Sequence, residues 1–166
     1  AIDGNGYLEV TLPSGQTGYT RDGALKRTGE GVIVTSDGFP LIPEIVIPSD
    51  TIKISINANG EVYAKFQKDT DNQLLGQFTL AGFTNAKGLE ALGSNLFAET
   101  EASGPAFISA PGSGGLGTLR QGYLEDSTVD SVREITELIE AQRGYELNAK
   151  VISAADQMLA ATVQVR

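Results

Sequence analysis

Two pairs of carboxylates are the residues of this chain whose types could support catalysis. Glu9 with Asp22, and Glu99 with Glu101, could serve as acid and base in the hydrolysis of a glycosidic bond. Nothing in the sequence brings either pair together, so solvated charge is their expected role. The chain contains no histidine and no cysteine, which removes the common nucleophile systems, thiolate zinc sites and disulfides. The sequence therefore predicts a protein that is not an enzyme.

Two short stretches resemble ligand-binding patterns. Residues 112–117 match G-x-G-x-x-G, but a dinucleotide site needs a buried strand before the pattern and a helix after it, and Ala110-Pro111 precedes this one. Residues 57–61 resemble part of a calcium loop, yet Phe66 stands where the bidentate glutamate would be. A loop and a hairpin turn explain them better, so neither cofactor nor metal is expected.

Charge and hydropathy exclude further classes of function. The chain has 12 Lys and Arg against 21 Asp and Glu, a net charge of −9, which argues against binding to nucleic acid. No apolar run approaches the roughly 20 residues that a spanning helix needs, so no membrane insertion is expected. The first residues include neither a starting methionine nor a signal peptide, and we expect the N-terminus to be a cut.

Residues 1–125 read as a β-rich domain of short strands and hairpins. The clearest hairpin pairs 51–56 with 61–66 across Asn59-Gly60, read as a two-residue turn with positive φ. Residues 74–83 read as one further strand, and 89–92 as a single helical turn. The Gly-, Ser- and Pro-rich segment 102–117 reads as a loop.

Residues 126–166 are predicted to form one long amphipathic C-terminal α-helix, which makes the fold class α+β. Ser131 and Glu134 fit a capping box at its start. Apolar and interface-type residues then recur with a coiled-coil period, and four more, Val132, Ile139, Ala155 and Met158, widen the stripe. The predicted subunit interface comprises Val132, Ile135, Leu138, Ile139, Gln142, Tyr145, Ala149, Ile152, Leu159 and Val163. A helix of this length cannot be covered by the β region alone, so several neighbours are expected.

Several motifs, specific in order and spacing, resemble the hook and rod family of bacterial flagellar axial proteins. Residues 2–7 are similar to its G-x-G-[FY] opening, 19–25 to Y-T-R-x-G, 34–41 to V-T-x-x-G-x-P-L, 122–130 to G-x-L-E-x-S-N-V, and 142–159 to Q-R-A-Y-E-x-N-x-K…D-x-M-L. The matched positions are Gly4, Gly6, Tyr19, Arg21, Gly23, Gly38, Gly122, Tyr123, Arg143, Asn148 and Lys150. Thr128 and Gly144 depart from the pattern, where the family usually has asparagine and alanine.

The resemblance implies a mechanical subunit that associates with its own copies into a helical polymer, and with other flagellar rod and hook subunits. It also implies export through the flagellar secretion channel into the rod of the basal body. Residues 104–117 leading into Gln121-Gly122-Tyr123 favour the distal rod over the proximal rod and the hook. Family members carry a further N-terminal helix, which we expect to pair with the C-terminal one. The alternatives are a secreted β-rich module that binds cell-wall glycan, and a glycosidase.

Overall fold

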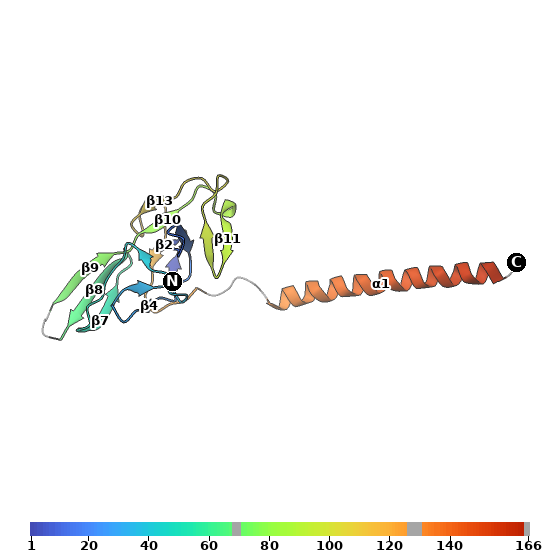
Figure 1. Ribbon diagram of the computed structural model, residues 1–166, viewed down its shortest axis with the longest axis horizontal. Coiled ribbons are helices and arrows are strands. Elements are labelled where there is room, and N and C mark those ends of the chain that lie inside the picture. Colours follow the sequence, from blue (N-terminus) through green and yellow to red (C-terminus); the bar gives the residue numbers. More distant parts are fainter. Residues whose placement is uncertain (68–70, 126–130, 165–166) are drawn as a thin grey trace. The chain divides into compact units, whose positions relative to one another are not determined.

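The computed structural model describes residues 1–67, 71–125 and 131–164, and within the helix the side chains of residues 135–153. Two units result, Ala1–Glu125 and Asp126–Arg166, and each is described by itself (Figure 1). The first consists of antiparallel strands and one short 3-10 helix, and the second contains one α-helix. The predicted α+β class is therefore confirmed.

The largest sheet of the first unit has five strands, in the order β11-β12-β3-β2-β6. A three-stranded sheet has the order β7-β8-β9, and three two-stranded pairs, β1-β14, β10-β13 and β4-β5, complete the unit's described part. The strands are β1 (Ile2–Asp3), β2 (Leu8–Thr11), β3 (Thr17–Thr20), β4 (Lys26–Arg27), β5 (Ile33–Val34), β6 (Leu41–Ile42), β7 (Thr51–Ile56), β8 (Glu61–Phe66), β9 (Asn72–Gln77), β10 (Leu80–Gly82), β11 (Glu90–Gly93), β12 (Leu96–Ala98), β13 (Phe107–Ser109) and β14 (Thr118–Leu119).

The hairpin of β7 and β8 has the predicted bounds but a different turn. The Asn57 amide donates to the Glu61 carbonyl and the Gly60 amide to the Asn57 carbonyl, at 3.1 and 3.0 Å. Only Gly60 has a positive φ, +85°, so the loop is a type I turn followed by a glycine bulge. The Asn57 side chain favours this longer loop because its Oδ1 accepts from the amides of Asn59 and Glu61.

Three other sequence predictions within the β unit are corrected. The segment 74–83 is two strands, β9 and β10, which pair with different partners. Residues 90–93 form strand β11, and the helical turn lies just before it, at Ala86–Gly88. The segment 102–117 contains β13, which pairs with β10. In each case pairing with another strand decided the structure, which local propensity does not report.

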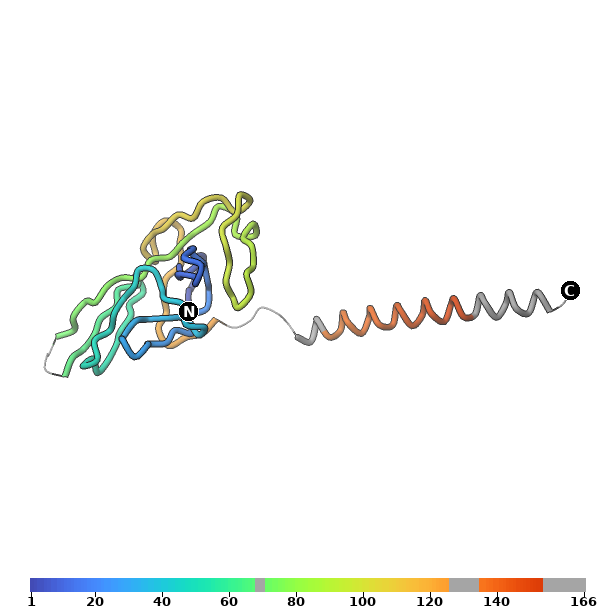
Figure 2. The backbone as a smooth tube through the Cα atoms, in the orientation of Figure 1, coloured from blue at the N-terminus to red at the C-terminus, as the bar shows by residue number. Residues whose placement is uncertain are grey.

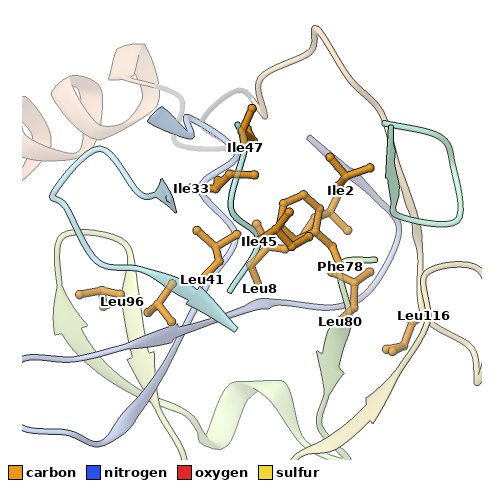
Figure 3. Packing of buried hydrophobic residues seen from close by; sticks show 12 residues of the cluster. Ile2, Leu8, Ile33, Leu41, Ile45, Ile47, Phe78, Leu80, Leu96 and Leu116 are labelled. Atoms are coloured by element: carbon orange, nitrogen blue, oxygen red, sulfur yellow. The ribbon is translucent and has the colours of Figure 1, made fainter. Parts of the chain in front are cut away.

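One apolar cluster holds these small sheets together, and Figure 3 shows its side chains. Phe78 is only 1% exposed and Leu80 is fully buried. Their neighbours come from strands and loops throughout the unit: Ile2, Leu8, Val10, Ile33, Leu41, Ile45, Ile47, Val62, Leu96 and Leu116. Because Ile2 and Leu116 lie near opposite ends of the unit's sequence, both ends are built into one core.

The second unit contains α1 (Ser131–Gln164). The helix begins at the serine that the sequence analysis predicts as its cap, but the side chains of residues 131–134 lie outside those described. Gly144 is accommodated within the helix, and a Cβ atom there would meet nothing within 4 Å. No helix in the described part of the chain is long and apolar enough to cross a membrane.

Candidate assembly surfaces

Large apolar side chains of α1 are exposed along its described length. Tyr145 is 84% exposed, Ile152 63%, Leu138 60% and Ile135 56%, and Ile139 is exposed as well. Gln142 and Ala149, also predicted for the interface, are exposed between them. The remaining predicted interface residues, Val132, Leu159 and Val163, lie outside the described side chains.

These exposed residues form one stripe, which we call the helix stripe: Ile135, Leu138, Ile139, Gln142, Tyr145, Ala149 and Ile152. Successive helical residues turn by about 100°, so the helix stripe covers an arc of about 140°. Leu147 and Val151, 63% and 67% exposed, lie on the opposite side and form a second apolar strip. The heptad pattern does not include this pair, although its i, i+4 spacing is visible in the sequence. Apolar residues on two sides of one helix favour contact with more than one neighbour.

Three family-motif segments of the β unit converge on Arg21. Its Nη1 donates to the Gly6 carbonyl and its Nη2 to the Gly4 carbonyl, both at 3.1 Å. Its Nε donates to Glu125 at 3.0 and 3.1 Å, and Nη2 forms an ion pair with Glu125 Oε1 at 2.9 Å. The guanidinium also lies 5.8 Å from the centre of the Tyr7 ring. We call Gly4, Gly6, Arg21 and Glu125 the arginine clasp.

The arginine clasp joins the two ends of the β unit. Beside it, β1 pairs with β14, and Arg120 forms an ion pair with Asp3 at 2.7 Å. In Figure 2 the blue start of the chain lies beside the orange segment near residue 118. Gly4 is required here, because a Cβ atom would lie 2.8 Å from the Gly117 Cα. The clasp therefore determines where the chain leaves the β unit.

The sequence motifs include Arg21, Gly4 and Gly6 but predict neither the clasp nor the part played by Glu125. The available signal was charge: Arg21 is the one cation in the Y-T-R-x-G stretch, and Glu125 is the one ionised side chain in the G-x-L-E stretch, so the two stretches offer charges of opposite sign. Gly122 has a positive φ of +81°, and Tyr123 is 62% exposed. Both lie in the G-x-L-E stretch, residues 122–125, of which Glu125 is the last residue.

The remaining motif residues are not part of the clasp. Tyr19 is buried in an aromatic cluster, where its ring meets Phe83 edge-on at 4.8 Å. Gly38 lies in a tight turn, donating to the Thr35 carbonyl, and Gly23 approaches Ala1. On α1, Arg143, Asn148 and Lys150 are exposed.

Three of the carboxylates considered for catalysis are buried or accept hydrogen bonds that stabilise the fold. Glu9 is only 5% exposed on β2, and burial raises the pKa of its carboxyl group above the ordinary value. Asp22 accepts from the Ala24 amide and the Ser36 hydroxyl, at 2.8 and 3.1 Å. Glu99 accepts from the Ala106 amide at 3.0 Å. In the described part of the chain, no group of three or more carboxylate-type ligands could hold a metal ion.

The glycine-rich stretch is a loop, as predicted. The Gly112 amide donates to the Gly117 carbonyl at 2.8 Å, and β14 rather than a helix follows. The helix N-terminus that a dinucleotide site uses to hold pyrophosphate is therefore not built after this stretch.

Two family models match the two ends of the chain. Residues 1–64 match the D1 domain of the flagellar hook protein FlgE/F/G, and residues 120–165 match the C-terminal part of the flagellar basal-body rod FlgEFG proteins. These matches include every segment of the arginine clasp and all of α1. The chain belongs to the flagellar hook and basal-body rod family.

Among individual members of this family, the chain is 52% identical to the flagellar basal-body rod protein FlgG of Caulobacter vibrioides over 166 residues, all of this chain and 63% of that protein. It is 39% identical to FlgG of Bacillus subtilis, over all of this chain and 64% of that protein. The flagellar hook protein FlgE of Salmonella typhimurium is 41% identical over 72% of this chain and 29% of its own length. The chain thus spans just under two thirds of the rod proteins that it matches.

Proposed function

We propose that the chain forms part of a structural subunit of the distal flagellar rod. Copies polymerise helically into the drive shaft that carries torque from the motor to the hook, and they are exported through the flagellum's own channel. Rod proteins named FlgG align with the whole chain, whereas the hook protein aligns with 72% of it, which supports the rod over the hook.

The observation that carries this proposal is the exposed helix stripe. Burying a large apolar side chain contributes about 1.5–3 kcal/mol, so residues such as Leu138, Tyr145 and Ile152 offer substantial free energy to a neighbouring helix. Shafts built by stacking need such contacts between copies, because torque passes through every interface in series. The second strip, Leu147 and Val151, allows the same helix to meet another neighbour on its far side.

Replacing Ile152 with glutamate in the complete protein tests this function. We expect Ile152→Glu to abolish rod assembly and swimming, because a charge would have to be buried between helices. The β unit should stay folded. Purified basal bodies, electron microscopy and motility agar provide the readouts.

Ile152→Leu is the matched control, since it keeps an apolar side chain of the same volume at the same position. It should assemble and swim like the wild type. Normal rods in the glutamate variant would show that Ile152 faces no helix in the shaft, and the interface assignment would have to be abandoned.

A further inference from the structure

The outer side of the three-stranded sheet carries an unusual pair of lysines. Strand β8 buries Val62, Ala64 and Phe66 on its inner side. Its outer side, together with those of β7 and β9, forms what we call the lysine face: Lys53, Ser55, Tyr63, Lys65 and Asn72, which line a hollow of about 230 Å³. Lys53 and Lys65 are direct partners in the register of β7 and β8. Like charges placed opposite each other destabilise a sheet.

No internal counter-charge offsets this cost within residues 1–67 and 71–125. The ion pairs there join Arg21 to Glu125 and Arg120 to Asp3, so neither lysine of the lysine face takes part in one. Glu61 is the carboxylate on the same side of β8, but it accepts from Asn57 and Tyr63, at 2.7 and 2.8 Å. Asp71, next to Asn72, forms no ion pair with either lysine. A like-charge pair kept unpaired in an acidic protein is suited to an external anionic partner.

Apolar side chains accompany the lysine face. Leu74 of β9 is the register partner of Tyr63 and is 51% exposed, and Ile52 of β7 is 63% exposed at a bulge. Isolated anions would gain nothing from these side chains. A protein surface that combines carboxylates with an exposed aliphatic residue would use both.

The same unit carries a segment of that composition, which we call the acidic hairpin. Glu90 and Leu92 lie in β11, Glu99 and Glu101 follow β12, and all four are exposed. Strand β11 is at the edge of the five-stranded sheet, and all four of its residues are exposed. Leu92 is 48% exposed. Residues 84–101 contain three acidic residues and a single basic one, Lys87, so this segment has a net negative charge. An edge strand left open in this way is available to another chain.

Figure 1 shows β7, β8 and β9, which carry the lysine face, at one end of the β unit and β11 of the acidic hairpin at the other, with β2 and the N-terminus between them. Two complementary surfaces on different parts of one molecule form a head-to-tail contact, which repeats from copy to copy without closing on itself unless the geometry makes a ring. We propose that the acidic hairpin of one copy docks on the lysine face of the next copy. This inference rests on the proposed helical polymer and names the residues of one contact between its β units.

Cysteine cross-linking in the complete protein tests the contact directly, because residues 1–166 contain no cysteine. We expect Lys65→Cys combined with Leu92→Cys to give a ladder of oligomers with a short bismaleimide in cells that assemble flagella. Each single variant should give no ladder. Lys65→Cys with Asp37→Cys, a second exposed position, is the matched control and should also give none. Motile cells whose double variant forms no ladder would overturn the proposal.

Charge exchange provides the second test. Lys53→Glu with Lys65→Glu should reduce the number of assembled rods, and Glu90→Lys with Glu101→Lys should do the same. The protein carrying all four changes should recover assembly, since the attraction is restored with its direction reversed. Four changes that assemble no better than either pair would overturn the proposal.

Two further results separate this inference from others. If the Lys53→Glu, Lys65→Glu variant assembles as well as the wild type, the inference fails while the rod function stands. If the wild type itself forms no helical polymer, the proposed function fails first. If the Lys53→Glu, Lys65→Glu variant no longer binds purified peptidoglycan but still self-associates, the partner of the lysine face is an anionic glycan. That result would overturn the contact between copies.

Discussion

Removing the Arg21 side chain should destabilise the β unit by a predictable amount. The bond to the Gly6 carbonyl is partly buried, and a bond from a charged donor in such a place is worth about 1–1.5 kcal/mol. The more exposed bond to Gly4 should contribute about 0.5 kcal/mol. Arg21 and Glu125 are 30% and 41% exposed, so their ion pair adds only about 0.5 kcal/mol. Arg21→Ala should therefore cost about 2 kcal/mol.

Two related substitutions separate the contributions to this loss of stability. Arg21→Lys keeps the charge but cannot reach two carbonyls and a carboxylate at once, so it should cost about 1 kcal/mol. Glu125→Gln removes only the ion pair and should cost about 0.5 kcal/mol or less. Because the clasp joins the residues just after β1 to the segment after β14, the loss should be accompanied by faster hydrogen exchange at the amides of Leu119 and Arg120.

Urea denaturation, followed by the circular dichroism of the tyrosine side chains, measures these free energies of unfolding. Mass spectrometry measures the rate of amide hydrogen exchange in the segment 118–125. The reasoning would be refuted if Arg21→Ala and Arg21→Lys were equally stable, since the fork geometry would then be irrelevant. It would also be refuted if exchange increased evenly over the β unit, because the clasp would then not act on its two ends.

Two further predictions concern the core. Phe78→Ala should cost about 3–5 kcal/mol, because the ring is 1% exposed and its removal leaves a cavity, whereas Phe107→Ala, at a side chain 43% exposed, should cost about 1 kcal/mol in the same urea titration. Glu9 has a folded-state pKa raised by burial, so its contribution to stability is present below its unfolded pKa, near 4.5, and is lost as pH rises through the folded value. Glu9→Gln should therefore become more stable relative to the wild type between pH 4 and pH 7, and an unchanged difference between the two proteins would contradict this.

The elements that the sequence predicts well are those with a strong local signal. Strands β7 and β8 alternate apolar and polar residues on either side of a turn sequence, and their bounds are as predicted. The helix α1 begins at Ser131, where a capping pattern meets a change of period. The elements that the sequence predicts wrongly lack a strong local signal. Residues 89–92 look helical by composition, but pairing with β12 makes 90–93 a strand. Residues 107–109 carry few turn signals of their own and become β13 only through β10.

By itself, the sequence determined the family, the class of fold and the exclusion of most catalytic designs, because these depend on which residues are present and on their order along the chain. Only the tertiary structure decided that Gly4, Gly6, Arg21 and Glu125 form one clasp, since Arg21 and Glu125 are 104 positions apart and meet through strand pairing. It alone placed Lys53 opposite Lys65, because register is a property of two strands together. The physical reason is the same in both cases: periodicity reports which side of an element is buried, and contacts between elements depend on how their surfaces pack.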